Sequence, residues 1–205
     1  MFLQRLRDLV NGDRDKYTLQ ELLDHFGSSS IVVALVLVTF ITSIPLPPWG
    51  GGFETIPGGI ISLILAMQGL MGVDKLYLPD FISSIMIDVS IIKDSKYTQN
   101  IFDWLEENIE PDRYEWALNV FTEKLMYILI IPHALLMILP IIFTNGPPSQ
   151  CITLMALSWL VHDGFYFLIM LGLSMCIIIV YAILIAFSAK FLYRTRKTWT
   201  FGIWK

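Results

Sequence analysis

The chain has 205 residues, of which 55% are hydrophobic and 16% are charged, and its formal net charge is −4. Soluble domains carry roughly 25% charged residues, so the composition speaks against a soluble globular protein, and the negative charge speaks against nucleic-acid binding. Residues 125–187 contain one charged side chain, Asp163. Apolar runs of about 18 or more residues indicate membrane spans. We therefore expect an all-α, polytopic transmembrane helical bundle.

The first 30 residues form a charged N-terminal tail. Thr18 and Glu21 have the spacing of a capping box, in which each side chain satisfies a backbone N–H at a helix start. Gly27 suits a C-cap, so we predict a short helix over residues 18–26. The first apolar run begins only at Ile31, which does not fit a cleavable signal peptide, so we expect the protein to stay in the membrane when mature.

Residues 31–72 are predicted to form a broken membrane hairpin. Its apolar arms, residues 31–44 and 60–72, flank a segment rich in proline and glycine that includes Pro45, Pro47 and Pro57. A straight span needs about 20 residues. Each arm therefore either borrows loop residues or is a re-entrant half-helix, and the sequence leaves both alternatives open.

Residues 73–124 form a polar middle segment with eleven acidic and five basic side chains. Apolar residues between 101 and 109 recur at helical spacing, which indicates an amphipathic helix on the membrane or on the bundle. The second membrane block, residues 125–187, has apolar segments at 125–143, 151–161 and 165–187 with breaks at Pro140 and Pro147. Its 11-residue middle segment is a candidate half-span.

The tail of residues 188–205 combines basic and aromatic side chains, which favour the headgroup layer of a lipid membrane. Lys and Arg occur in the two tails and the middle segment and are missing from the links between apolar segments. The positive-inside rule then predicts that all three polar regions, and thus both termini, are cytoplasmic. The second block would cross an even number of times.

A weak internal repeat relates the two membrane blocks at an offset of 90 residues. Short, Pro/Gly-interrupted segments at corresponding positions of two halves point to a transporter-like site at mid-membrane depth. The matching pairs are Pro57 with Pro147, Leu65 with Met155, Ala66 with Ala156, and Leu70 with Leu160.

Glu54 is the sharpest candidate for a mid-membrane site, because it lies in the break of the first hairpin. An acid at bilayer depth costs roughly 2.5–3.5 kcal/mol and is usually functional or paired. The alternative is a solvated acid in an external loop. His162 and Asp163 form either a proton relay with Glu54 or an ordinary Asp-Gly turn.

Three further polar residues complete the candidate site. His133 follows Pro132 in an apolar helix and either hydrogen-bonds across helices or binds a ligand. Gln68 and Asn145 lie near the two breaks, where they are expected to satisfy freed backbone groups. The cysteines and histidines lack zinc spacing, and neither a phosphate loop nor a catalytic triad stands out. We therefore expect no metal, no cofactor and no enzymatic activity.

The chain resembles the ExoD family of bacterial inner-membrane proteins over residues 18–187. The resemblance rests on residues 44–47 (Ile-Pro-Leu-Pro), Pro57-Gly58, Ala66-x-Gln68 and Leu78-Pro79 in the first half. In the second half it rests on Leu139-Pro140, Asn145, a short helix through Ala156, and the triplet of residues 162–164 (His-Asp-Gly). His162 replaces the usual acid, and residues 49–54 depart from the usual turn.

The resemblance implies a role in exopolysaccharide synthesis or in tolerance of alkaline stress. Two functions remain in competition. The first is a small transporter, as a monomer or a homo-oligomer, with the broken hairpins around a central site. The second is a non-transporting scaffold that holds polysaccharide-synthesis machinery through the acidic middle segment.

Overall fold

The computed structural model describes residues 14–43, 55–73, 86–88, 112–139 and 146–202, with single residues at 8, 12, 76, 83, 84, 107 and 110. Six α-helices lie in these ranges, which confirms the all-α prediction. One small antiparallel pair of strands, β1 (Lys16–Thr18) and β2 (Met86–Asp88), was not predicted. The helices are α2 (Leu19–Phe26), α3 (Ser30–Ser43), α4 (Thr55–Met71), α8 (Val120–Ile138), α9 (Gly146–Leu160) and α10 (Gly164–Gly202).

Helix α2 begins as the sequence predicts. The Thr18 hydroxyl accepts from the Glu21 N–H at 3.1 Å, and the Glu21 carboxylate accepts from the Thr18 N–H at 2.9 Å. Gly27 ends the helix with φ +57°, a conformation that glycine adopts without steric cost. Leu22, Leu23 and Phe26 are buried and attach α2 to the start of α3.

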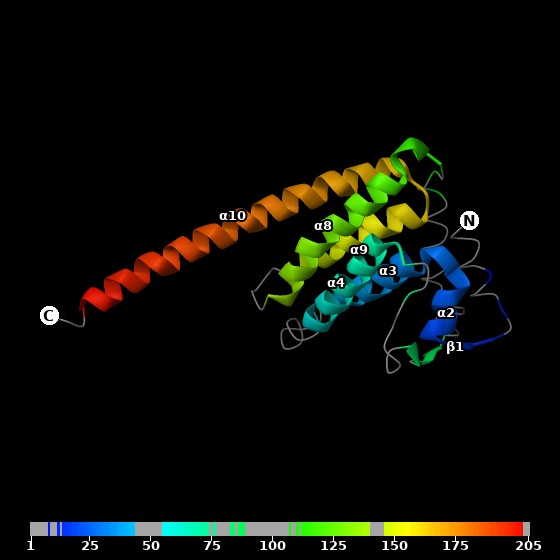
Figure 1. Ribbon diagram of the computed structural model, residues 1–205, viewed down its shortest axis with the longest axis horizontal. Coiled ribbons are helices and arrows are strands. Elements are labelled where there is room, and N and C mark those ends of the chain that lie inside the picture. The colour runs from blue at the N-terminus through cyan, green and yellow to red at the C-terminus, as the bar shows by residue number, and fades with distance from the viewer. Residues whose placement is uncertain are drawn as a thin grey trace.

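Helices α3, α4, α8 and α9 form an antiparallel bundle of two hairpins (Figure 1). The packing between the hairpins is crosswise, since α3 lies along α9 and α4 lies along α8. Pro57 and Pro147 sit in the first turns of α4 and α9. Proline is tolerated there because the first N–H groups of a helix have no intrahelical partner. These two prolines therefore start helices instead of breaking them.

Helix α10 is continuous over 39 residues and runs from the bundle into open space (Figure 1). Its first part packs against α9 and α8, with Phe167 and Ser174 buried. Beyond Ile178 its described side chains are largely exposed. The predicted span over residues 165–187 thus lies within a longer helix that continues into the predicted C-terminal tail.

Two helical segments in the described part of the chain are long and apolar enough to cross a membrane, Val120–Ile138 and Gly164–Phe191. Shorter apolar segments cover Ser30–Phe40 and Ile56–Met71. This supports the prediction of a membrane protein. Spanning or re-entry of the short arms, including the predicted half-span at 151–161, stays a prediction, as do the two related halves.

Candidate functional site

The predicted site residues fall into two groups. Glu54, Asn145, Pro45, Pro47 and Pro140 lie outside the residues that the structure describes. The others lie in described helices or turns. Gln68 is half-buried on α4, His133 is buried in α8, and His162 and Asp163 form the turn between α9 and α10.

Asp163 is fully buried and serves as the N-terminal cap of α10. Its Oδ1 accepts from the backbone N–H groups of Phe165 and Tyr166, both at 3.1 Å. These are two of the N–H groups that a helix start leaves without an intrahelical partner. The interpretation of the His-Asp-Gly triplet as a turn is therefore supported by geometry, and the carboxylate has a structural task.

The same carboxylate forms an ion pair with Arg113. Arg113 Nη2 donates to Asp163 Oδ2 at 2.8 Å, and Arg113 Nε donates to Oδ1 at 3.3 Å. This two-point contact raises the pKa of Arg113 above its ordinary value, chiefly through the hydrogen bonds to Asp163. The guanidinium also lies over the rings of Phe165 and Tyr166, 4.5 and 5.0 Å from their centroids.

Backbone contacts lock this turn to the polar middle segment. The His162 carbonyl accepts from the Asp112 N–H at 3.0 Å, and the Gly164 N–H donates to the Arg113 carbonyl at 2.8 Å. A side chain on Gly164 would collide with the Tyr114 carbonyl oxygen, so only glycine fits. His162 takes a left-handed conformation with φ +59°, and its side chain is exposed. The relay of His162 and Asp163 with Glu54 stays a prediction.

His133 is a buried polar group of α8, five residues before the helix ends at Ile138. Its Nδ1 lies 2.8 Å from the carbonyl oxygen of Leu129, and the ring is fully buried. A carbonyl can only accept, so Nδ1 carries the proton and Nε2 presents a lone pair to the bundle. Nε2 has no hydrogen-bond partner among the described residues. Buried polar groups of this kind are rare and call for an explanation.

Ser62 on α4 is a second such group, since its Oγ is buried and has no hydrogen-bond partner among the described residues. Contacts of two glycines set the register of α4 against α8. A Cβ on Gly59 would lie 2.8 Å from the Ala134 carbonyl oxygen, and one on Gly69 would meet the Tyr127 ring. Ser62 lies between these glycines and is therefore level with the turn of α8 that carries His133.

Thr39 and Thr153 extend this polar layer to the other helix pair. The Thr39 hydroxyl donates to the Leu35 carbonyl at 2.7 Å. Its oxygen then accepts from the Thr153 hydroxyl at 2.8 Å, which joins α3 to α9. Both side chains are buried. Each of the four bundle helices thus contributes at least one polar side chain to the interior, and we call Thr39, Ser62, His133 and Thr153 the interior polar set.

The interior polar set is made of neutral hydrogen-bonding groups. Within the described ranges, no cluster of three His, Cys, Asp or Glu residues is arranged to hold a metal ion. The set contains two hydroxyls already paired with each other, one hydroxyl without a partner, and one imidazole nitrogen without a partner. Such a set can hold a small hydrogen-bonding species or exchange a proton at His133.

Sequence reasoning identified His133 and Asp163 and missed Arg113, Ser62, Thr39 and Thr153. Arg113 had one available signal, because Asp163 is the only charge in residues 125–187 and a buried charge needs a partner. The hydroxyl residues gave no signal, since Ser and Thr are common in apolar helices, where they hydrogen-bond to their own backbone.

Comparison with known proteins places these features in a family. Residues 2–185 match the family model described as "Exopolysaccharide synthesis, ExoD". No curated protein matches significantly, and neither does any solved structure.

Proposed function

Because the chain belongs to the ExoD family of exopolysaccharide synthesis, we propose that it serves this process as a small, non-enzymatic transporter. Its site would be the interior polar set between the two hairpins. Family membership implies the role in exopolysaccharide synthesis. Transport, and any role in alkaline-stress tolerance, is our proposal.

The observation that carries this proposal is the pair of unpartnered polar atoms on facing helices. Ser62 Oγ and His133 Nε2 come from different hairpins, and both are buried without a partner among the described residues. A buried polar group without a partner costs about 1–3 kcal/mol relative to a satisfied one. A transported species that forms hydrogen bonds with these two atoms would remove this cost, which explains why the atoms have no partner within the protein.

The crosswise packing of the hairpins also supports transport. At the offset of 90 residues, α4 corresponds to α9, and their burial patterns agree closely. Pro57 and Pro147 are both exposed, while Ala66 and Ala156 are both fully buried. Two related hairpins that pack α3 on α9 and α4 on α8 would have a pseudo-two-fold axis between them, where transporters place their sites.

The test uses three variants and measures released exopolysaccharide per cell. Ser62→Ala and His133→Leu are expected to lower output severalfold, because each removes one unpartnered polar atom and little volume. Ser174→Ala is the matched control for Ser62→Ala, since the Ser174 side chain is equally buried but belongs to α10. Membrane content and thermal unfolding of each purified variant check the fold. Normal output from Ser62→Ala and His133→Leu would contradict the proposal.

The scaffold is the second candidate function, and the exposed surface of the chain favours it. Helix α10 leaves large apolar side chains exposed beyond the bundle, including Ile179, Ile183 and Phe187. The described end of the middle segment exposes acids, among them Glu110 and Glu115. Deletion of residues 93–110 should then remove co-purifying polysaccharide-synthesis proteins while the membrane part stays folded. Unchanged co-purification would remove this candidate.

A further inference from the structure

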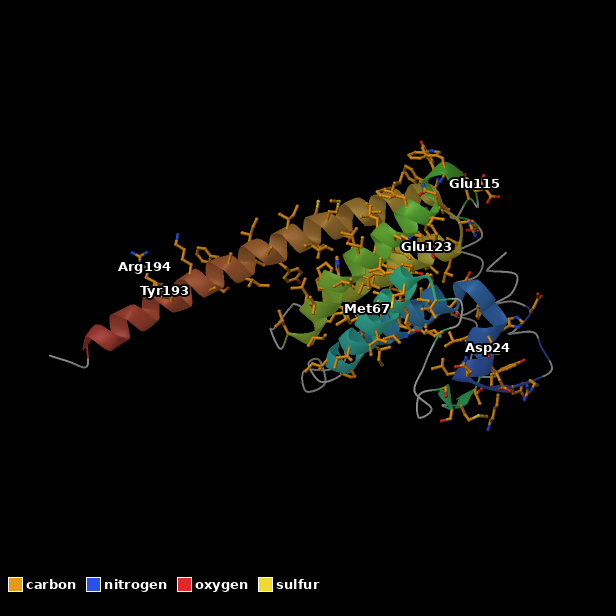
Figure 2. All side chains as sticks on the ribbon, in the orientation of Figure 1. Asp24, Met67, Glu115, Glu123, Tyr193 and Arg194 are labelled. Atoms are coloured by element: carbon orange, nitrogen blue, oxygen red, sulfur yellow. The ribbon has the colours of Figure 1, made fainter. Side chains whose placement is uncertain are left out.

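Exposed aromatic side chains gather near both ends of the long apolar part of α10. Near its start, Tyr166 is 37% exposed, and Trp116 on the adjoining 3₁₀ turn (Glu115–Ala117) is 70% exposed. Near the far end, Tyr193 is 75% exposed (Figure 2). The first belt comprises Trp116, Phe165 and Tyr166, and the second belt comprises Phe187, Phe191 and Tyr193.

Basic groups accompany both belts, and no charge lies between them on α10. Arg113 stacks on Phe165 and Tyr166 of the first belt. Lys190 and Arg194 are exposed beside the second belt, one helical turn apart. Residues 164–189 carry no charged side chain. Aromatic rings with basic neighbours prefer the headgroup layer, while the uncharged stretch prefers hydrocarbon.

The spacing of the belts matches the thickness of a bilayer. Tyr166 and Tyr193 are 27 residues apart in one continuous helix, which corresponds to about 40 Å. A bilayer measures about 40–45 Å with its headgroup layers. We propose that the two belts bind the two headgroup layers of one lipid bilayer, so that α10 crosses the membrane once, from one layer to the other. This placement does not depend on what the hairpins do.

One consequence concerns sidedness. Residues 112–117 adjoin the first belt and Lys190 adjoins the second, so they lie on opposite sides of the membrane. This topology differs from the sequence-based prediction, which placed the middle segment and the C-terminus together in the cytoplasm. That prediction inferred an even number of crossings for residues 125–187. Under this proposal α8 and α9 run in opposite directions (Figure 1) and α10 crosses once, so this block ends on the side opposite to its start.

A second consequence concerns the depth of the start of α9 in the membrane. Cys151 Sγ lies 3.9 Å from the carbonyl oxygen of Met170. Since α9 and α10 are antiparallel, Gly146 is level with about residue 175 of α10. That level is about 14 Å along the helix from Tyr166 and about 27 Å from Tyr193. The start of α9 therefore lies inside the hydrocarbon layer, short of the far surface.

Nitroxide spin labels on single cysteines test the belts. The background is Cys151→Ser with Cys176→Ser, and the labelled positions are Tyr166→Cys, Ile179→Cys and Tyr193→Cys, all exposed. The protein is placed in vesicles of phosphatidylcholine with a minor share of phosphatidylglycerol. We expect the label at Ile179→Cys to have the highest collision rate with oxygen and the lowest with a nickel chelate. The labels at the two tyrosine positions should have collision rates typical of the headgroup layer. A fully aqueous label at Tyr193→Cys would overturn the proposal.

Sidedness is tested with a membrane-impermeant maleimide in vesicles of both orientations. Trp116→Cys and Arg194→Cys in the same background are expected to react from opposite faces. Reaction of both from the same face would show that α10 does not cross, whatever the depth values indicate. Both side chains are exposed in the structure, so neither substitution is expected to disturb the fold.

Discussion

Arg113 and Asp163 are 50 residues apart in sequence, and the Arg113 guanidinium donates two hydrogen bonds to the Asp163 carboxylate, from Nη2 at 2.8 Å and from Nε at 3.3 Å. The same carboxylate caps α10. One buried acid therefore fixes the start of the long helix and ties it to the polar middle segment.

Arg113→Met is expected to lower the free energy of unfolding, because it leaves a fully buried carboxylate without its ion-pair partner. Asp163→Asn should cost less, about 1–3 kcal/mol. The amide oxygen still caps α10, and the guanidinium, 26% exposed, keeps access to water. Unfolding in detergent followed by circular dichroism measures both. A larger cost for Asp163→Asn would contradict this account of the ion pair.

Gly164→Ala is expected to destabilise the protein by about 1–3 kcal/mol, because the new Cβ collides with the Tyr114 backbone carbonyl. Gly172→Ala on the same helix is the matched control. Its Cβ meets nothing within 4 Å, so the higher helix propensity of alanine should leave stability unchanged or raise it by up to about 1 kcal/mol. Thermal unfolding of the two variants should thus shift in opposite directions or by clearly different amounts.

The hydrogen bond between Thr39 and Thr153 is expected to couple α3 to α9. In a double-mutant cycle with Thr39→Val and Thr153→Val, the coupling energy should be about 0.6 kcal/mol and no more than roughly 1.7 kcal/mol. Valine keeps the shape and removes the hydroxyl, so the cycle isolates the hydrogen bond. A coupling energy indistinguishable from zero would mean that the two hydroxyls do not interact in the membrane.

The first turn of α2 is expected to depend on pH through Glu21. Hydrogen bonding from the Thr18 N–H lowers the pKa of Glu21 below its ordinary value of 4.5. A group with a lowered folded-state pKa stabilises the fold above its ordinary pKa and loses this contribution as the pH falls through the lowered value. Hydrogen exchange of residues 18–22 should therefore accelerate, beyond the intrinsic rate, only below about pH 4.5.

Glu21→Gln is the control for this effect. Glutamine keeps the reciprocal geometry of the capping box and does not titrate, so exchange in the same turn should lose its acid dependence. An acid-induced loosening that persists in Glu21→Gln would assign the effect to another group.

Local signals predicted the local structure. Three predicted features depend only on neighbours within four residues, and the structure has all three. They are the capping box of Thr18 and Glu21, the C-cap at Gly27, and the turn at residues 162–164. The long apolar run predicted α10 for the same reason, since a membrane span is a property of one segment.

Contacts between residues far apart in the sequence were not predicted. Lys16 lies opposite Asp88 in the register of β1 and β2, and Arg113 forms an ion pair with Asp163. Neither contact leaves a local pattern in the sequence. The position of Ser62 opposite His133 depends on the register of α4 on α8, which the contacts of Gly59 and Gly69 define. Register between helices depends on side-chain packing, and a single sequence does not contain it.

The central claim is that the two hairpins enclose a water-accessible polar site within the membrane. Its most direct test is cysteine labelling at Glu54→Cys and Gly146→Cys in the Cys151→Ser, Cys176→Ser background, with a membrane-impermeant reagent applied from each face. A Cβ at Gly146 meets nothing within 4 Å, so the cysteine fits. We predict that both positions react from both faces, as a shared water-accessible cavity requires. Reaction from one face alone would make both turns ordinary external loops and contradict the claim.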